Sequence, residues 1–123
     1  MPRATLTPQE LAIMKIVWSL ERATVRDVYE ALRERREIAY TTVMTMMRIL
    51  EEKGYLTKTQ VERAYEYRPT RSRQEVLGDL VREFIDRVFD GAAAPLLVHL
   101  ARDRRLSKAE KEKLRRLAEE IEE

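Results

Sequence analysis

Few side chains in this 123-residue sequence have a type and spacing that could perform catalysis or bind a metal. There is no cysteine, which excludes disulfides, thiolate metal sites and cysteine nucleophiles. His99 is the only histidine, and a lone imidazole without cysteines or paired carboxylates nearby is typical of a surface or an interface. Asp27 and Glu30 lie one turn apart, but they resemble ordinary helix charges rather than a catalytic pair. The sequence therefore predicts no enzyme, no metal site and no cofactor.

The segment AYTTVMTMMRILEEKG, residues 39–54, has an unusual composition for a helix. It ends as helices commonly do, with charged residues before Gly54. Its first half instead contains three threonines and a valine, which are β-branched and form helices only moderately well. A helical wheel places its large apolar side chains on one face, which is expected to be buried and consists of Val43, Met46, Met47 and Leu50.

The opposite face of this helix carries short or polar side chains. It holds Thr41, Thr45, Arg48 and Glu52, with Thr42 and Met44 at its margins. Short hydroxyl side chains would let the helix approach a duplex closely, and threonine can contact a phosphate, a base edge or a thymine methyl group. We therefore predict that residues 39–53 enter the major groove. The alternative is that these threonines are ordinary surface residues.

The order of the predicted elements supports this interpretation. Helices are expected at 8–19, 24–35 and 39–53, the first beginning with a Thr7–Glu10 capping box. Two short antiparallel strands follow over residues 55–69, with a turn near Glu62-Arg63. Three helices and a hairpin predict a mainly α fold with a small β-hairpin, the winged helix-turn-helix.

The predicted hairpin also carries cations that could lie along a phosphate backbone. The residues predicted to contact DNA are Tyr40, Thr41, Thr42, Met44, Thr45, Arg48, Lys58, Arg63 and Arg68. Residues 1–74 hold 14 Lys and Arg against 10 Asp and Glu, whereas residues 75–123 hold 10 against 12. This mildly basic first part is compatible with nucleic-acid binding. The alternative is that the hairpin charges only solvate an edge strand.

The remaining residues predict a helical region with a wide apolar surface. Helices are expected at 72–89 and 92–104 and after a Ser107 cap. Their apolar surface is too large for these helices to bury alone, so we predict a homodimer rather than a monomeric subdomain. The domains are then 1–71 for DNA binding and 72–123 for dimerisation. The residues predicted to form the dimer are Leu77, Leu80, Val81, Phe84, Ile85, Val88, Phe89, Leu96, Leu97, Leu100, Leu114 and Leu117.

Over about residues 5–121 the sequence resembles the penicillinase-repressor family, the BlaI/MecI/CopY group of bacterial regulators. The resemblance is carried by the stretches LTPQELAIMKIVWSL, TVRDVYEAL, AYTTVMTMMRILEEKGYL and RAYEYRP. The segment FIDRVFDGAAAPLLVHLARDRRLSKAEKEKLRRL is similar to the family's C-terminal dimerisation region.

This resemblance implies a homodimeric transcriptional repressor that binds inverted-repeat operators. By position, Thr41, Thr42, Met44 and Thr45 would contact DNA. It also implies a partner, a membrane sensor with a metalloprotease domain, whose signal leads to cleavage of the repressor. The pair His99-Leu100 stands where relatives carry the scissile bond. The absence of cysteine excludes the copper-sensing branch.

Two other functions remain open from the sequence. One is a winged helix that only binds protein, and the other is a ligand-sensing regulator with an effector pocket between the helices expected at 8–19 and 72–89. No stretch reaches the ~18 apolar residues of a membrane span, and the N-terminus has no signal-like apolar segment. We expect a cytoplasmic protein without direct membrane insertion.

Overall fold

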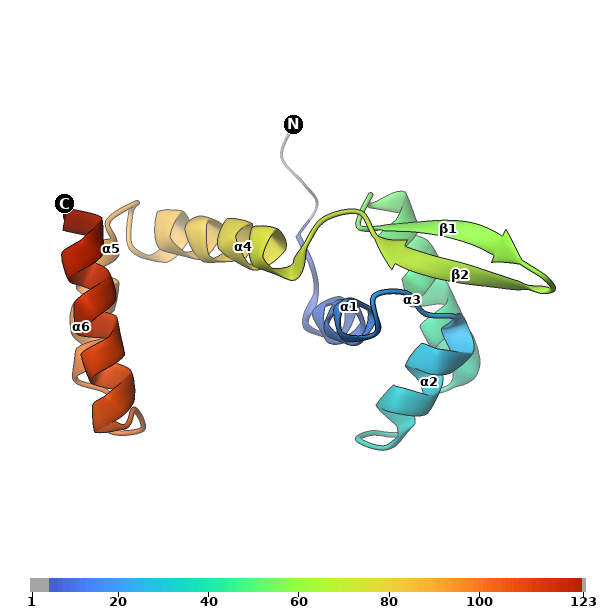
Figure 1. Ribbon diagram of the computed structural model, residues 1–123, viewed down its shortest axis with the longest axis horizontal. Coiled ribbons are helices and arrows are strands. Elements are labelled where there is room, and N and C mark those ends of the chain that lie inside the picture. The colour runs from blue at the N-terminus through green and yellow to red at the C-terminus, as the bar shows by residue number, and fades with distance from the viewer. Residues whose placement is uncertain (1–4, 123) are drawn as a thin grey trace. The chain divides into compact units, whose positions relative to one another are not determined.

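The computed structural model describes residues 5–122 (Figure 1). The chain forms two compact units, and the boundary along the sequence falls between Val76 and Leu77. The first unit contains α1 (Pro8–Leu20), α2 (Val25–Arg33), α3 (Tyr40–Glu52), β1 (Leu56–Val61), β2 (Ala64–Pro69) and the start of α4 (Arg73–Val88). The second contains the rest of α4, α5 (Ala93–Ala101) and α6 (Lys108–Glu122). This order confirms the three helices and the hairpin expected from the sequence.

Local hydrogen bonds explain where the helices begin. Thr7 Oγ1 accepts from the Glu10 backbone N–H at 3.2 Å, and the Glu10 carboxylate accepts from the Thr7 N–H at 2.8 Å. The same reciprocal arrangement opens α2 at Thr24 and Asp27 and α6 at Ser107 and Glu110. Each such capping box satisfies two backbone donors that a helix start would otherwise leave unpaired.

Two helices end earlier than expected from the sequence. The second was predicted to reach residue 35, but α2 stops at Arg33, and the Arg35 N–H bonds to the Leu32 carbonyl three residues back rather than four, which tightens the chain into a turn. The fifth was predicted to reach residue 104, but α5 stops at Ala101. Its continuation is a turn in which the Asp103 carboxylate accepts from the Arg105 N–H at 2.9 Å. Such local side-chain bonds compete with the helical ladder.

The first three helices enclose the core of the first unit. Its fully buried large side chains are Ile13, Met14 and Val17 from α1, Val28 from α2, and Val43, Met47 and Leu50 from α3. Val76 is also buried, with 2% of its surface exposed. The first turn of α4 therefore belongs to this unit.

The hairpin extends beyond the helices and is joined to them at its base (Figure 1). Its register runs from Leu56 opposite Pro69 to Val61 opposite Ala64, which leaves the expected two-residue turn at Glu62 and Arg63. Ala23, between α1 and α2, pairs with Tyr67 of β2 through N–H···O bonds of 2.9 and 2.8 Å. This bridge acts as a very short third strand and anchors the hairpin to the helices.

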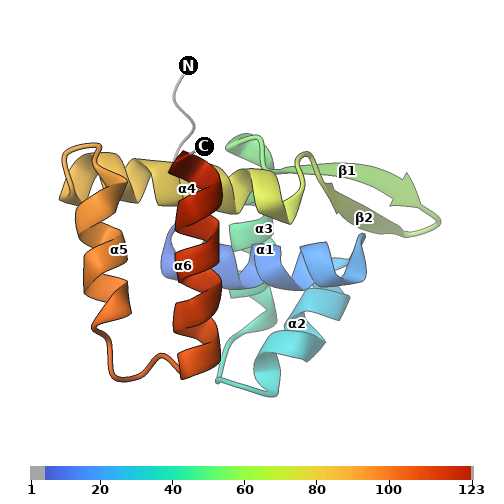
Figure 2. The same cartoon turned by 60° about the vertical axis from the view of Figure 1, so that its left-hand side comes forward.

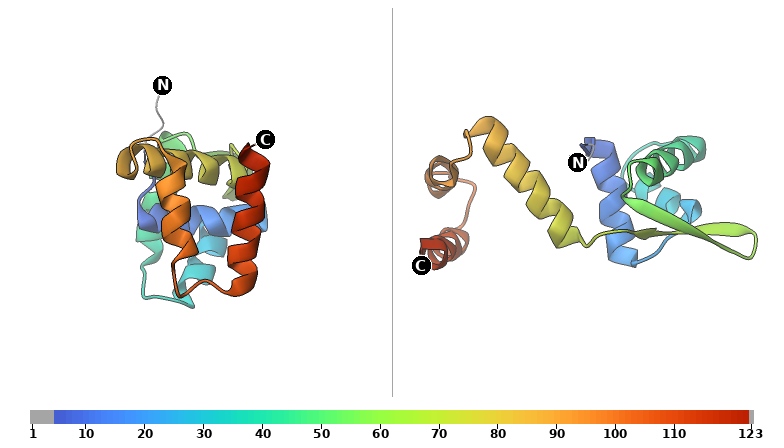
Figure 3. Two further views of the ribbon diagram at one scale, coloured as in Figure 1. Left: turned by 90° about the vertical axis from the view of Figure 1, so that its left-hand side faces the viewer. Right: turned by 90° about the horizontal axis from the view of Figure 1, so that it is seen from above.

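In the second unit, α5 and α6 lie side by side and run antiparallel (Figures 2 and 3). This unit buries little apolar surface by itself. None of the described α5 residues is fully buried, and Val81, Phe84 and Val88 of α4 are 53%, 40% and 51% exposed. Apolar side chains in such number at a surface are typical of an interaction site.

A buried ion pair joins the start of α1 to the end of α3. Glu10 is only 4% exposed, and its Oε1 accepts from Lys53 Nζ at 2.8 Å. Lys53 Nζ also donates to the Thr5 carbonyl at 3.1 Å. Burial alone would raise the pKa of the Glu10 carboxyl, but the hydrogen bonds from Lys53 and from the Thr7 backbone outweigh it, so its pKa is lowered.

We predict that Glu10→Gln lowers the free energy of unfolding at pH 7 by about 1–3 kcal/mol, because Lys53 loses a partly buried charged partner. A carboxyl group whose pKa is lowered by folding stabilises the protein above its unfolded pKa of roughly 4.3 and loses this effect as the pH falls through the folded value. The difference between wild type and Glu10→Gln should therefore shrink below about pH 4.

Urea denaturation at a series of pH values and fixed protein concentration measures this difference. Glu52→Gln, at an exposed position on the last turn of α3, is the matched control and should change stability by less than about 0.5 kcal/mol. A pH-independent effect of Glu10→Gln would contradict the assigned role of the charge.

Candidate nucleic-acid interface

The structure orients α3 as the helical wheel predicted. Val43, Met47 and Leu50 are buried and Met46 is half-buried, whereas Thr41, Thr42, Thr45 and Arg48 are exposed. Met44 and Tyr40 are 46% and 42% exposed. The side chains predicted to face DNA are therefore available to a partner.

The start of α3 differs from those of α1, α2 and α6. Its N-cap is Ala39, whose methyl group cannot accept a hydrogen bond, and its first turn carries no acidic side chain. Thr42 and Val43 donate their N–H groups to the Ala39 carbonyl, but the earlier N–H groups of this turn lack such an acceptor in the helix. Free N–H groups and the helix dipole favour an anion at this end. The geometry therefore suits a phosphate group.

A groove of about 610 Å³ lies between α3, the start of α2 and the hairpin. Its lining includes many of the residues predicted to contact DNA, namely Tyr40, Met44, Thr45, Arg48, Lys58 and Arg63. Thr41, Thr42 and Arg68 are exposed but lie outside it. The fold thus brings the exposed face of α3 and the turn of the hairpin to one concave surface.

The hairpin cations differ in whether they are already paired. Lys58 Nζ lies 3.4 Å from a Glu51 carboxylate oxygen and 4.5 Å from the centre of the Tyr65 ring. Arg68 lies 3.5 Å from the Glu66 carboxylate. In the part of the chain that the structure describes, Arg63 and Arg48 have no ion pair. These two arginines are therefore the most available to bind phosphate.

The groove also includes residues that were not predicted from the sequence. Thr24 and Arg26 at the start of α2 and Tyr65 and Tyr67 of β2 line it. Tyr67 is 4% exposed, and this burial raises the pKa of its hydroxyl, which therefore remains protonated and neutral. Thr24 and Arg26 could have been predicted from the sequence, because they stand at the start of the second helix of a helix-turn-helix. The contribution of the tyrosines depends on strand register and could not be read from composition.

Tyr40 is held in place although it is exposed. Its ring packs edge-on against Tyr29 of α2, with 5.5 Å between ring centres, and Arg33 lies 5.7 Å from the Tyr29 ring centre. An aromatic pair of this geometry fixes the orientation of both rings. The first residue of α3 is therefore positioned by α2.

The residues predicted to form the dimer differ in exposure. Val81, Phe84 and Val88 are exposed, while Leu77, Leu80, Phe89, Leu96, Leu97, Leu100 and Leu114 are half-buried. Ile85 is already 8% exposed within one chain and has little surface left to bury in a dimer. The side chain of Leu117 lies outside the described residues. A groove of about 480 Å³ between α5 and α6 adds further apolar surface, including Leu97, Val98 and Leu114.

The pair His99-Leu100 lies in the last turn of α5. His99 is exposed and Leu100 is half-buried, and the His99 carbonyl accepts from the Arg102 N–H at 3.2 Å. A protease binds its substrate in an extended conformation, so cleavage here would first require this short helix to open locally.

The described residues also bear on two other kinds of site. Among the side chains that the structure describes, no group of three or more His, Cys, Asp or Glu could hold a metal ion. No helix formed by the described residues is long and apolar enough to cross a membrane.

Comparisons with known proteins agree with this geometry. The penicillinase repressor family matches residues 6–120 of the chain. The transcriptional regulator BlaI of Mycobacterium tuberculosis is 37% identical over 115 residues, which cover 92% of this chain and 82% of that protein. The methicillin resistance regulatory protein MecI of Mammaliicoccus sciuri is 21% identical over 112 residues, 91% of each chain.

Two solved structures confirm the winged-helix fold. The solution structure of the DNA-binding domain of the repressor BlaI matches with a TM-score of 0.54 and 23% identity, over 60% of this chain and 90% of that one. The monomeric form of Bacillus licheniformis BlaI in complex with the blaP half-operator matches with a TM-score of 0.52 and 23% identity, with the same coverage.

The expectation that the chain is not an enzyme is confirmed by these relatives, which are regulators and repressors. The family match spans both units of the structure, from the start of α1 into α6. With the relative at 37% identity, it establishes that the chain belongs to the penicillinase repressor family.

Proposed function

We propose that this protein is a transcriptional repressor that binds operator DNA through α3 and the hairpin. The observation that carries this proposal is the groove that combines the exposed face of α3 with Arg48 and Arg63. The threonines of α3 have no long charged side chains around them at the start of the helix, so the backbone could approach base edges closely. A relative of this family, BlaI, has been solved with a half-operator, which supports the assignment.

Each part of the interface would have its own task. Thr41, Thr42, Met44 and Thr45 would read base edges, with the Met44 side chain available for thymine methyl groups. Arg63 and the start of α3 would bind phosphate and fix the register on the duplex. Lys58 and Arg68 would first have to break their ion pairs with Glu51 and Glu66, so their net contribution to DNA affinity should be smaller.

The repressor would act as a homodimer on an inverted repeat. Val81, Phe84 and Val88 offer exposed apolar surface on α4, and a second copy could cover it. A two-fold dimer would present two α3 helices to half-sites roughly 10 base pairs apart or a multiple of that distance. Linking two half-site contacts can raise affinity by about 10²–10⁴ without any new base contact.

Repression would be relieved by cutting the chain within residues 92–106, which include α5. Cleavage there would remove dimer contacts while leaving α3 and the hairpin intact. His99-Leu100 is the proposed bond, and a membrane sensor with a metalloprotease domain is the proposed source of the signal. Such a repressor would work in the cytoplasm, where its operator DNA lies.

Arg63→Ala should weaken binding to all duplexes to a similar extent and reduce the salt slope by about one unit, because one phosphate contact is lost. Arg68→Ala is the matched control, since Glu66 already pairs with that arginine and its removal should change the slope less. Affinity measured by fluorescence anisotropy at several salt concentrations tests both. Lost sequence preference with an unchanged slope would contradict a phosphate-binding role for Arg63.

Thr45→Glu should abolish operator binding and leave the thermal midpoint within a few degrees, because Thr45 is exposed and faces the groove. A carboxylate at this position would meet the negative charge of the duplex. Ser19→Glu, an exposed position on α1 outside this groove, adds the same charge and should retain binding. Normal operator affinity in Thr45→Glu would remove α3 from the proposed interface.

The double variant Phe84→Glu/Val88→Glu should produce a monomer that still binds a half-site. Both side chains are exposed in one chain, so the fold should survive while a dimer would have to bury two charges per copy. Sedimentation reports the assembly state, and affinity for a full palindrome should fall by about 10²–10⁴. Undiminished palindrome affinity in a monomeric variant would exclude dimer-controlled repression.

A further inference from the structure

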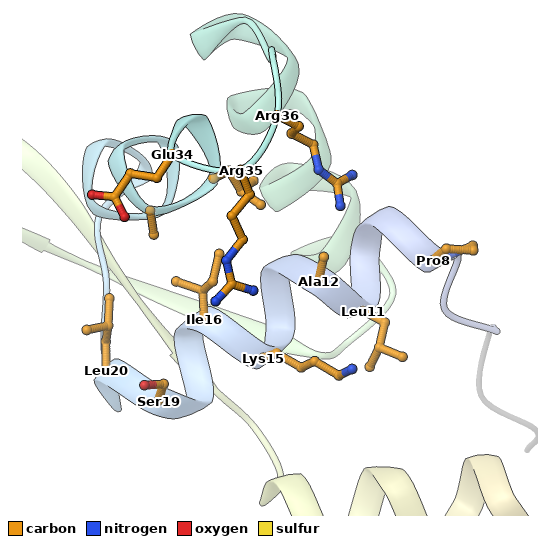
Figure 4. Close-up of a pocket in the computed structure, with 12 residues that line it drawn as sticks. Pro8, Leu11, Ala12, Lys15, Ile16, Ser19, Leu20, Glu34, Arg35 and Arg36 are labelled. Atoms are coloured by element: carbon orange, nitrogen blue, oxygen red, sulfur yellow. The ribbon is translucent and has the colours of Figure 1, made fainter. Parts of the chain in front are cut away.

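The outer face of α1 forms a second groove, of about 620 Å³, with the end of α2 (Figure 4). Leu11, Ala12, Ile16 and Leu20 of α1 form its apolar floor, together with part of α2. Within the described residues, its lining shares no residue with the groove between α3 and the hairpin. It is therefore a separate surface of the first unit.

This face of α1 is not needed for the core. Ile13, Met14 and Val17 are the α1 side chains that are fully buried there. A second series lies along the groove at helical spacing, namely Leu11, Ala12, Lys15, Ile16, Ser19 and Leu20. Leu20 is 47% exposed, and Leu11 and Ile16 are half-buried. The helix thus has an additional stripe, mostly apolar, from Leu11 to Leu20, a length of about 14 Å.

Three cations border this stripe. Lys15 projects from α1, while Arg35 and Arg36 reach from the turn after α2 toward Ile16 and Ala12 (Figure 4). All three are exposed and have no ion pair within the part of the chain that the structure describes. The nearby Arg33 and Arg26, by contrast, pair with Glu30 at 3.4 and 3.8 Å. Glu34 also lines the groove but points away from Arg35 and Arg36 (Figure 4).

We propose that this groove binds an acidic amphipathic helix of a partner protein. Such a helix buries apolar side chains at i, i+3, i+4 and i+7 in a groove, and its acidic flanks would meet Lys15, Arg35 and Arg36. Ala12 and Ser19 are small enough to let a second helix backbone approach α1 closely. The length of the stripe favours contact with two to three turns of a helix over a small molecule, which would leave most of it exposed.

The proposal adds a second binding activity to the proposed repressor. Because the two grooves have separate linings, one first unit could hold DNA and the acidic helix together. A partner recruited in this way would be brought to the operator. Steering between opposite charges would make its binding weaken as salt increases.

The test uses the intact chain and a fluorescein-labelled synthetic helix of about 16 residues, with leucines at i, i+3, i+4 and i+7, glutamates flanking that face and alanines elsewhere. A twin peptide with lysines in place of the glutamates is the control probe. Fluorescence anisotropy should show binding of the acidic peptide in the micromolar range, roughly tenfold weaker at 0.5 M salt than at 0.05 M, and little binding of the basic twin.

Charge-reversed variants separate this surface from the DNA groove. Lys15→Glu/Arg35→Glu should weaken acidic-peptide binding at least about tenfold and retain operator affinity. Arg48→Glu/Arg63→Glu makes the same change in net charge. It should weaken operator binding and leave acidic-peptide binding unchanged. Since all four side chains are exposed, folding is checked by the thermal midpoint. The salt series on the unmodified chain tests the proposal even if a variant fails to fold.

Several outcomes would overturn the proposal. Equal binding of the acidic and basic peptides, or an unchanged affinity in Lys15→Glu/Arg35→Glu, would exclude recognition by these cations. Binding of decanoate with the same cation dependence, without binding of the peptide, would identify a small-carboxylate site instead. A change of sedimentation in Lys15→Glu/Arg35→Glu would show that a second copy of the chain occupies the groove.

Discussion

Burial of Val43, Met47 and Leu50 fixes the rotation of α3, and the arrangement of the first unit depends on it. These three side chains lie in one stripe, and all are fully enclosed by α1, α2 and the base of the hairpin. Turning the helix about its axis would expose them and bury Thr41 and Thr45 without hydrogen-bond partners. Hydrophobic burial thus holds the threonine face outward, although no residue of that face contributes to the core.

The hairpin is held against the helices by backbone hydrogen bonds as well as by packing. The Ala23–Tyr67 bridge attaches β2 to the segment between α1 and α2, and Thr70 Oγ1 donates to the Gly54 carbonyl at 2.7 Å. Trp18 Nε1 donates to the Arg71 carbonyl at 3.0 Å, where the chain leaves the hairpin. The turn that carries Arg63 therefore projects from a base that is tied to the helices, and it lines the same groove as α3.

The two units expose different kinds of side chain. The first has a closed core and presents polar side chains on α3, whereas α4 and α5 retain exposed apolar side chains such as Phe84 and Val98. Exposed apolar surface costs free energy in water until a partner covers it. The proposed association through the second unit and the proposed DNA recognition through the first would therefore use different surfaces. The stripe on α1 is a further case of apolar surface that the core of its own unit does not use.

By itself, the sequence determined the helices, the hairpin turn and the face of α3 that is exposed. Capping boxes, helical periodicity and a two-residue turn depend on neighbours within a few positions, so Thr7–Glu10 and Glu62-Arg63 were readable from the chain. Only the tertiary structure decided which hairpin cations are free. Lys58 pairs with Glu51 and Arg63 does not, because strand register and helix packing place residues of distant sequence at ion-pair distance. For the same reason, the cations above the α1 stripe were not recognised, since Lys15 and Arg35 meet only when α1 packs beside α2.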